Sequence, residues 1–163
     1  TQSKSFNGKK ILLHFLNNKD WRTEVEDHNI IYGSLLGVKV SFIAYPFFIP
    51  KQKFQHHGTI SVLSPLDIAV MKITAISQRG RKRDFFDLYW CAKNIDSLEN
   101  IILHLPAQYP SVAHNYHHIF KALVYFADAE SDPNPEILFD ATWRKVKNFF
   151  NLEIPRIAHK IMR

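Results

Sequence analysis

The chain has 163 residues, of which 46% are hydrophobic and 22% are charged, and these proportions exclude a disordered or fibrous protein. Its net charge of +6 suits an acidic partner such as RNA or a nucleotide, and its single cysteine, Cys91, excludes an internal disulfide framework. No apolar run is long enough to cross a membrane, so we expect a cytoplasmic protein with no membrane partner.

The N-terminal part of the chain predicts one short helix followed by strands. Residues 6–18 carry the apolar side of a helix. Residues 23–32 and 37–45 read as two strands of an antiparallel hairpin, joined through the segment Gly33-Ser34-Leu35-Leu36-Gly37. A polar loop at residues 51–57 and a short third strand at residues 58–63 complete this part.

The segment from Ser64 to Lys93 carries the strongest local signals, and it predicts two helices. Ser64 is a typical N-cap and Pro65 suits the first helical position. Gly80 ends this helix in a short basic loop, and Asp84 is the expected N-cap of the second helix. The apolar face of the first helix has the period of 3.6 residues and comprises Leu66, Ala69, Val70, Ile73 and Ile76.

Charged side chains of these two helices are the main candidate site. Lys72 and Arg79 lie two turns apart on one face, and Asp84 and Asp87 are i,i+3 neighbours. In a packed hairpin the cations approach the carboxylates. Cations bind phosphate, and carboxylates serve metal binding or proton transfer. A purely structural interpretation stays open, in which Asp84 caps its helix and Arg79 and Arg83 pair with the aspartates.

Further helices are predicted in the C-terminal half. Asp96 is expected to cap a helix that ends near Leu105, and residues 112–127 form the next. Asp140 is expected to cap another helix, and Pro155 to begin a last short one. The whole pattern predicts the α+β class: a small, mostly antiparallel sheet at the N-terminal end, followed by a helical bundle from Ser64 onward.

Two weaker metal-site patterns also occur. His114, His117 and His118 have the i, i+3, i+4 spacing that zinc can use, but no cysteine or carboxylate accompanies them, which favours a polar helix face. Glu24 and Glu26 alternate onto one face of a strand, where an exposed strand start is the favoured interpretation. A zinc site built on the His114 group stays open as a weaker hypothesis, which metal analysis of the purified protein would test.

The central segment resembles a known family. The run LSPLDIAVMKITAISQRGRKRDFFDLYW is similar to the D-x-A-x-x-K-x-x-A … R-x-x-x-R-D-x-x-D-L signature of the abortive-infection nucleotidyltransferase toxins of the AbiEii/AbiGii type. The preceding LGVKVSFIAYP resembles the family's strand before this helix. The later HHIFKALVYFADAESDPNPEILFDATWRKVKNFF resembles its helical C-terminal part. Together these segments cover the chain from about residue 30 to about residue 150.

The resemblance implies a role for each signature residue. It makes Lys72 a catalytic, phosphate-contacting lysine, with Arg79 and Arg83 as further nucleotide- and phosphate-binding cations. It makes Asp84 a catalytic carboxylate on a helix, with Asp87 as a second catalytic carboxylate in support. It implies that the intact protein, with Mg²⁺ and a nucleoside triphosphate, transfers a nucleotide to an RNA acceptor such as transfer RNA. An antitoxin is the implied protein partner.

The chain departs from the family in one large respect. The family's Gly-Ser is followed by an Asp-x-Asp on a strand that holds magnesium, whereas here no acidic residue lies between Asp27 and Asp67. We therefore expect a C-terminal portion of a longer toxin, with residues 1–63 as a remnant of the nucleotidyltransferase core and residues 64–163 as its helical part. Such a chain is expected to be inactive alone and to hold no metal or cofactor tightly.

Two other hypotheses remain open at this point. One is a degenerate homologue that has lost catalysis. The other is a non-catalytic module that uses its basic loops to bind RNA or an antitoxin, for which the salt dependence of RNA binding is the discriminating measurement.

Overall fold

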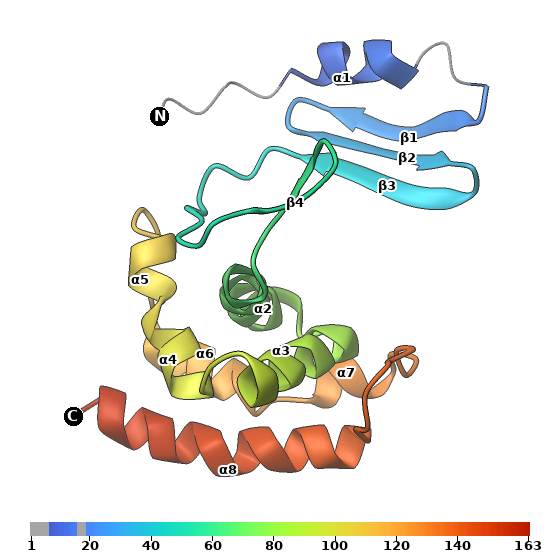
Figure 1. The fold of residues 1–163 in the computed structure, drawn as a ribbon. Helices are drawn as coiled ribbons and strands as arrows, with labels where there is room; N and C mark the ends of the chain where they lie inside the picture. The colour runs from blue at the N-terminus through green and yellow to red at the C-terminus, as the bar shows by residue number, and fades with distance from the viewer. Residues whose placement is uncertain (1–6, 16–18) are drawn as a thin grey trace. The chain divides into compact units, whose positions relative to one another are not determined.

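A computed structural model describes residues 7–15 and 19–163, which belong to two compact units (Figure 1). The first unit ends at Pro46 and the second begins at Phe47. Strands precede helices along the chain, so the predicted α+β class, with a small antiparallel sheet near the N-terminus followed by helices, is confirmed. No described helix combines the length and the apolar character that a membrane span needs.

The first unit is one helix and a three-stranded antiparallel sheet. Helix α1 (Gly8–Phe15) precedes strands β1 (Trp21–Asp27), β2 (Ile30–Leu35) and β3 (Val38–Ile43), which pair in the order β1-β2-β3. Phe15 stacks on Trp21 with ring centroids 4.6 Å apart, so α1 and the sheet share aromatic contacts. The predicted helix ends at residues 6 and 16–18 lie outside the described residues.

The single long strand predicted over residues 23–32 is wrong, because β1 and β2 are separate strands. The chain reverses after Asp27, whose carboxylate accepts a hydrogen bond from the N–H of His28, a local turn contact that competes with strand extension. The predicted connection at residues 33–37 is mostly strand. Only Leu36 and Gly37, both with positive φ, form the turn to β3.

Gly33 is required in β2 by the packing of a neighbouring side chain. A Cβ at this position would lie 2.4 Å from the Trp21 ring and 2.6 Å from the carbonyl oxygen of Arg22. Gly33 and Ser34 lie inside strand β2, where they pair with residues of both β1 and β3. In this chain the glycine accommodates an aromatic ring on the adjacent strand.

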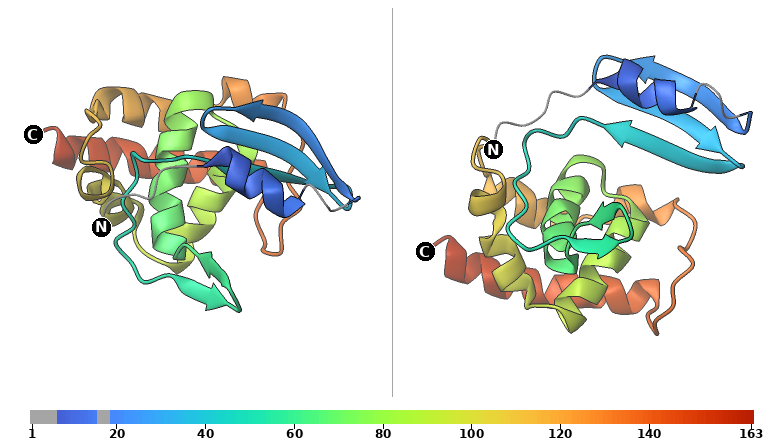
Figure 2. Two further views of the ribbon diagram at one scale, coloured as in Figure 1. Left: turned by 90° about the horizontal axis from the view of Figure 1, so that it is seen from above. Right: turned by 45° about the horizontal axis from the view of Figure 1, so that its top comes forward.

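The second unit begins with a small hairpin. Strand β4 (Gln55–His57) pairs with β5 (Ile60–Val62), and the two form a sheet of their own (Figure 2). The predicted loop at residues 51–57 therefore contains a strand, and the strand predicted at residues 58–63 is shorter than expected. Both strands are largely exposed, so the alternation of apolar and polar residues gave little signal.

Helices α2 (Pro65–Arg79) and α3 (Lys82–Asn94) form the predicted hairpin. The hydroxyl of Ser64 accepts a hydrogen bond from the N–H of Asp67, and Gly80 ends α2 in the left-handed conformation with φ of 54°. The predicted N-cap at Ser64 and the predicted helix end at Gly80 are therefore confirmed. The N-cap of α3 is Arg81, not Asp84, and its side chain makes no cap hydrogen bond. Asp84 is instead a buried residue of the first turn.

The core of the second unit joins this hairpin to the later helices. Figure 1 shows the long helix α8 (Trp143–Ile161) running along α3 and α6 (Tyr116–Leu123). Three short helices, α4 (Leu98–Leu103), α5 (Leu105–Gln108) and α7 (Ala127–Glu130), complete the bundle. The central side chains, all fully buried, are Ala69, Val70, Ile73, Phe85, Leu88, Ile101, Ile102, Leu123, Val146 and Phe150.

Several helix ends differ from the predicted ones. Ser97, Asn115 and Thr142 are the N-caps that accept a backbone hydrogen bond, rather than Asp96 or Asp140. In place of the helix predicted over residues 112–127, the structure has the shorter helix α6. Pro155 does not begin a helix but lies inside α8, where Ile154 and Ile157 are both buried and fix the helix against the core on either side of the proline.

We predict that Gly80→Ala lowers the free energy of unfolding of the second unit by about 1 kcal/mol, because an L-residue is strained at positive φ. An added Cβ would meet no atom nearer than 3.8 Å, so the loss isolates backbone strain. Urea denaturation measures it. Gly80→Asn is the control and should lose less, since asparagine tolerates this conformation; equal losses would contradict the strain assignment.

Candidate functional site

Of the five charged candidate residues, the structure brings four into one cluster: Lys72, Arg79, Asp84 and Asp87. Lys72 Nζ on α2 lies 2.8 Å from Asp84 Oδ1 and 2.6 Å from Asp87 Oδ2, both on α3. The guanidinium of Arg79, at the end of α2, lies 3.3 Å from Asp84 Oδ2. The helical spacings seen in the sequence produce this geometry, because the short connection between the helices forces them to pack as a hairpin.

Burial separates the two carboxylates of this cluster. The side chain of Asp84 is fully buried, whereas that of Asp87 is 49% exposed. Each oxygen of Asp84 faces a cation, Lys72 on one side and Arg79 on the other. Asp84 therefore connects the two helices from the inside, and Asp87 is the carboxylate of the cluster that faces solvent.

Lys72 is half-buried and remains charged. Burial lowers the pKa of its ammonium group. Hydrogen bonds to Asp84 and Asp87 and the charges of both carboxylates together raise the pKa by more than burial lowers it, so the net shift is upward. Two cations and two carboxylates make the cluster electrically neutral. An ammonium group has three N–H donors, and the two aspartates occupy two of them, so one donor of Lys72 is left for a further acceptor.

The basic loop does not act as one patch. Arg79 joins the cluster, but Arg83 is exposed and forms no ion pair with any residue that the structure describes. Arg81 pairs with Asp132, and the buried Lys82 donates to the backbone carbonyls of Glu130 and Asp132. Two of the loop's cations thus fix the acidic segment before α8.

Sequence reasoning missed a second buried carboxylate, Asp67. It accepts hydrogen bonds from the N–H groups of Lys51 and Gln52, each at 3.2 Å, and from the side-chain amide of Gln108 at 2.7 Å. Asp67 thereby fixes the chain before β4 and the end of α5 against α2. Its place in the first turn of α2 was visible in the sequence, but no local spacing links it to Gln108.

A pocket of about 730 Å³ opens beside Lys72 and Asp87. Its walls are helices α2 and α3 and the segment before α8. The lining residues are Pro65, Ile68, Lys72, Asp87, Trp90, Cys91, Glu136, Ile137, Leu138 and Phe139. Burial, and secondarily the charge of Asp87, raises the pKa of the Cys91 thiol to about 11, so this cysteine is protonated and unreactive at neutral pH.

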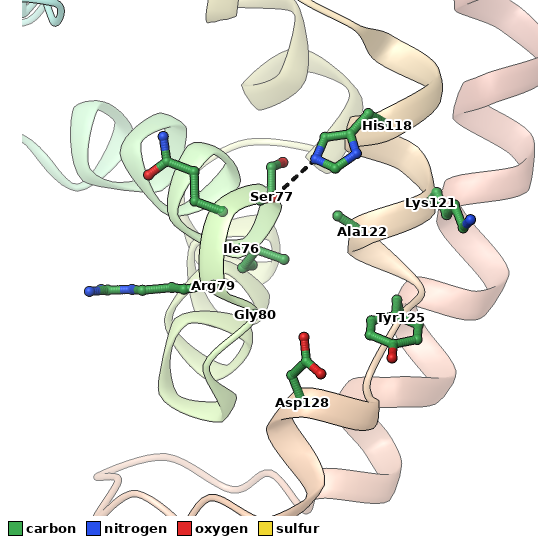
Figure 3. A pocket seen from close by; sticks show the side chains of 10 residues that line it. Ile76, Ser77, Arg79, Gly80, His118, Lys121, Ala122, Tyr125 and Asp128 are labelled. Atoms are coloured by element: carbon green, nitrogen blue, oxygen red, sulfur yellow. Dashed lines mark hydrogen bonds between the residues drawn. The ribbon is translucent and has the colours of Figure 1, made fainter.

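A smaller pocket, of about 430 Å³, lies between the end of α2 and α6 (Figure 3). His118 Nε2 is 3.0 Å from the carbonyl oxygen of Ser77, which joins the two helices across this pocket. Arg79 is part of its rim, but Figure 3 shows its side chain pointing away from the pocket. The cluster around Lys72 therefore belongs to the larger pocket.

The carboxylates present do not fit a resident magnesium ion. Within residues 7–15 and 19–163, no three histidine, cysteine or carboxylate side chains come together as metal ligands. The oxygens of Asp84 are occupied by cations, and Asp87 Oδ2 faces Lys72. His114 Nε2 lies 3.1 Å from the carbonyl oxygen of Tyr109, and His118 Nε2 lies 3.0 Å from the carbonyl oxygen of Ser77.

Comparison with known proteins identifies the family. The family model described as "Nucleotidyl transferase AbiEii toxin, Type IV TA system" matches residues 29–160. The chain belongs to this family. An uncharacterized protein of Aquifex aeolicus (strain VF5) is 32% identical over 124 residues, which are 72% of this chain and 56% of the relative. The chain thus spans little more than half of that relative's length. No solved structure matches.

Membership of the AbiEii family confirms the suspected resemblance, and the matching family model describes nucleotidyltransferase toxins of type IV toxin–antitoxin systems. The cluster around Lys72 lies within the matched residues, as do all the residues that line the larger pocket. In this AbiEii chain the signature residues Lys72, Arg79, Asp84 and Asp87 form one connected set, whereas Arg83 stands apart from it.

We predict that Asp84→Asn destabilises the protein far more than Asp87→Asn. Removing the buried charge leaves Lys72 and Arg79 without their shared partner and should cost about 3 kcal/mol, whereas the half-exposed pair should cost less than about 1 kcal/mol. Urea denaturation of both variants measures the difference. Equal losses would mean that Asp84 is not the structural link between α2 and α3.

The pKa of Lys72 predicts a pH dependence. Because the folded pKa lies above the unfolded value of 10.5, the stabilisation by its charge is fully present below pH 10.5 and is lost as pH rises through the folded pKa. The loss of unfolding free energy in Lys72→Met should therefore be constant from about pH 6 to about pH 9 and shrink in stronger alkali. Lys145→Met is the matched control, because Lys145 on α8 pairs with the exposed Asp140 before that helix. A difference that already declines near neutral pH would contradict the raised pKa.

Proposed function

We propose that this AbiEii chain carries the nucleotide-contacting part of a nucleotidyltransferase toxin that transfers a nucleotide from a nucleoside triphosphate to an RNA acceptor. The observation that supports this function is the cluster at Lys72, in which a charged lysine with one unused donor lines a large pocket. The chain spans 56% of its relative, so the activity proposed is that of the whole protein.

Lys72 and the arginines supply the phosphate contacts in this proposal. The remaining N–H of Lys72 donates to a phosphate oxygen, and the exposed guanidiniums of Arg79 and Arg83 add positive potential near the charge that develops during transfer. Asp84 is buried and touches no substrate, so it acts as a positioning residue that holds Lys72 and Arg79 in place.

Asp87 is the carboxylate that can act on the acceptor, because it is half-exposed beside Lys72. The acceptor hydroxyl oxygen forms a bond to the α-phosphorus, the bond from that phosphorus to the leaving pyrophosphate breaks, and the hydroxyl proton passes to the Asp87 carboxylate. The family's metal-holding Asp-x-Asp is not among these residues, so this chain contributes positioning, phosphate contact and proton transfer only.

The partners proposed are an RNA acceptor, with transfer RNA as the first candidate, and the antitoxin of the type IV system. Both the positive net charge and the exposed Arg83 suit the phosphate backbone of RNA. The cytoplasm is the proposed place of action, since RNA acceptors and nucleoside triphosphates occur there together.

We predict that Lys72→Ala abolishes growth inhibition by the protein that carries this chain and lowers nucleotide transfer to RNA at least about hundredfold, because the phosphate contact acts in the transition state. Labelled nucleoside triphosphates and cellular RNA provide the assay. Lys145→Ala, whose lysine pairs with an exposed aspartate on the surface, should behave as the unaltered protein.

Two outcomes would decide against this function. If Lys72→Ala and Asp87→Ala both keep full growth inhibition and transfer while folding normally, the cluster is not the site of transfer. If no transfer occurs in any form but RNA binds with a steep dependence on salt, the chain is a non-catalytic RNA-binding module.

A further inference from the structure

The larger pocket is lined by both charged and apolar side chains. Lys72 and Asp87 line it from α2 and α3, and Ile68, Trp90 and the segment Glu136–Phe139 line the rest. A volume of about 730 Å³ lies within the range of small-molecule sites. A ligand that fills it needs a charged or polar part for Lys72 and a flat apolar part for the remaining walls.

Trp90 is the unusual side chain in this pocket. Trp21 packs against Phe15 and Phe42, and Trp143 packs against rings of the core, each within 6.2 Å between ring centroids. Trp90 is partly buried, yet it has no ring partner and no acceptor for its indole N–H among the residues that the structure describes. It lies three residues after Asp87, one helical turn further along α3, so its ring is presented beside the candidate site.

The segment opposite Trp90 offers one acceptor. Glu136 is exposed and forms no hydrogen bond or ion pair within residues 7–15 and 19–163. Its neighbours Ile137 and Phe139 pack against the core, and Leu138 between them is fully exposed. Glu136 and Leu138 are both exposed to solvent, and both line the pocket.

We infer that this pocket binds the nucleobase of the nucleoside triphosphate, with Trp90 stacking on the base and Glu136 accepting a hydrogen bond from an amino group of the base. The inference rests on the proposed function, since it places the phosphates at Lys72. A base is flat and has a π-face that stacks on indole, and its amino groups are donors that a carboxylate accepts. A purely aliphatic ligand would leave the third N–H donor of Lys72 and the carboxylate of Glu136 without partners.

The first test compares a nucleotide with the same phosphates lacking a base. The ¹⁵N-labelled chain has three tryptophans, so it gives three indole N–H resonances, and the one that disappears in Trp90→Phe is that of Trp90. Titration with CTP should shift this resonance, while those of Trp21 and Trp143 stay in place. Inorganic tripolyphosphate should bind at Lys72 without shifting it.

Affinity gives the second readout of the same experiment. Trp90→Ala should weaken CTP binding about tenfold, which is the usual loss for one base–aromatic stack, and leave tripolyphosphate binding unchanged. Trp90→Phe should keep most of the affinity, because phenylalanine still stacks. Lys72→Ala should weaken both ligands. The dispersion of the backbone resonances shows that each variant is folded.

The outcomes separate this inference from the proposed function. If CTP and tripolyphosphate bind with equal affinity and neither shifts the Trp90 resonance, the base pocket is wrong while the phosphate contact stands. If neither ligand changes any resonance at millimolar concentration, both are wrong. If Trp90→Ala and Trp90→Phe weaken both ligands equally, Trp90 acts on the fold and not on the base.

The assignment of Glu136 has a matched pair of ligands. CTP and UTP differ where cytosine carries an amino donor and uracil a carbonyl acceptor. The unaltered chain should bind CTP about tenfold more tightly, since a carboxylate cannot pair with the uracil carbonyl. Glu136→Gln should reduce this preference to less than about twofold, because the glutamine amide serves as donor or acceptor. A preference that survives in Glu136→Gln would overturn the role of Glu136.

Discussion

The buried carboxylate of Asp84 is the contact on which the arrangement of α2 and α3 depends. It accepts from Lys72 with one oxygen and from Arg79 with the other, so the two cations of α2 converge on one residue of α3. Taking a carboxylate out of water costs several kcal/mol, and the ion pairs largely offset that cost without adding much stability. Stability therefore comes mainly from the apolar face that includes Ala69 and Ile73, while Asp84 joins α2 to α3 through its two cations.

The basic loop after α2 connects the site to the wall of the pocket. Arg81 and the backbone N–H of Lys82 both contact the carboxylate of Asp132. The Lys82 ammonium also lies 5.6 Å from the centre of the Trp143 ring at the start of α8. The segment Glu136–Phe139 lies between these two anchors. One short run of cations therefore sets both the position of Arg79 at the cluster and the ends of the segment that faces Trp90.

Local chemistry made the α2–α3 hairpin predictable. Ser64, Pro65 and Gly80 act through contacts within a few residues, and the 3.6-residue period of the apolar side chains is independent of the rest of the fold. The same spacing placed Lys72 opposite Asp84 and Asp87. The role of Asp84 was not predictable, because an aspartate near a helix start satisfies capping rules whether it is exposed or buried.

Other features depend on partners distant in sequence, and these were missed. Asp67 binds Gln108, 41 residues away, and Lys82 binds carbonyls 48 and 50 residues away. In the sheet, Gly33 reads as a turn residue, yet it is required by the Trp21 ring on the neighbouring strand. Trp90 also carried no local signal, since an aromatic residue on an apolar helix normally belongs to the core.

The neutrality of the cluster constrains how a nucleotide binds. A triphosphate that approaches Lys72 meets a cluster in which Asp84 and Asp87 balance the charges of Lys72 and Arg79, so long-range attraction must come from Arg83 and the net charge of the chain. Close contact then depends on the third donor of Lys72 and on Asp87, which is exposed enough to turn away from the lysine, whereas Asp84 is enclosed by the core. Binding energy from a base in the pocket lined by Trp90 would offset the cost of separating Lys72 from Asp87. Stacking and phosphate contact are therefore expected to be coupled, with the ion pair between Lys72 and Asp87 as the element that both of them act upon.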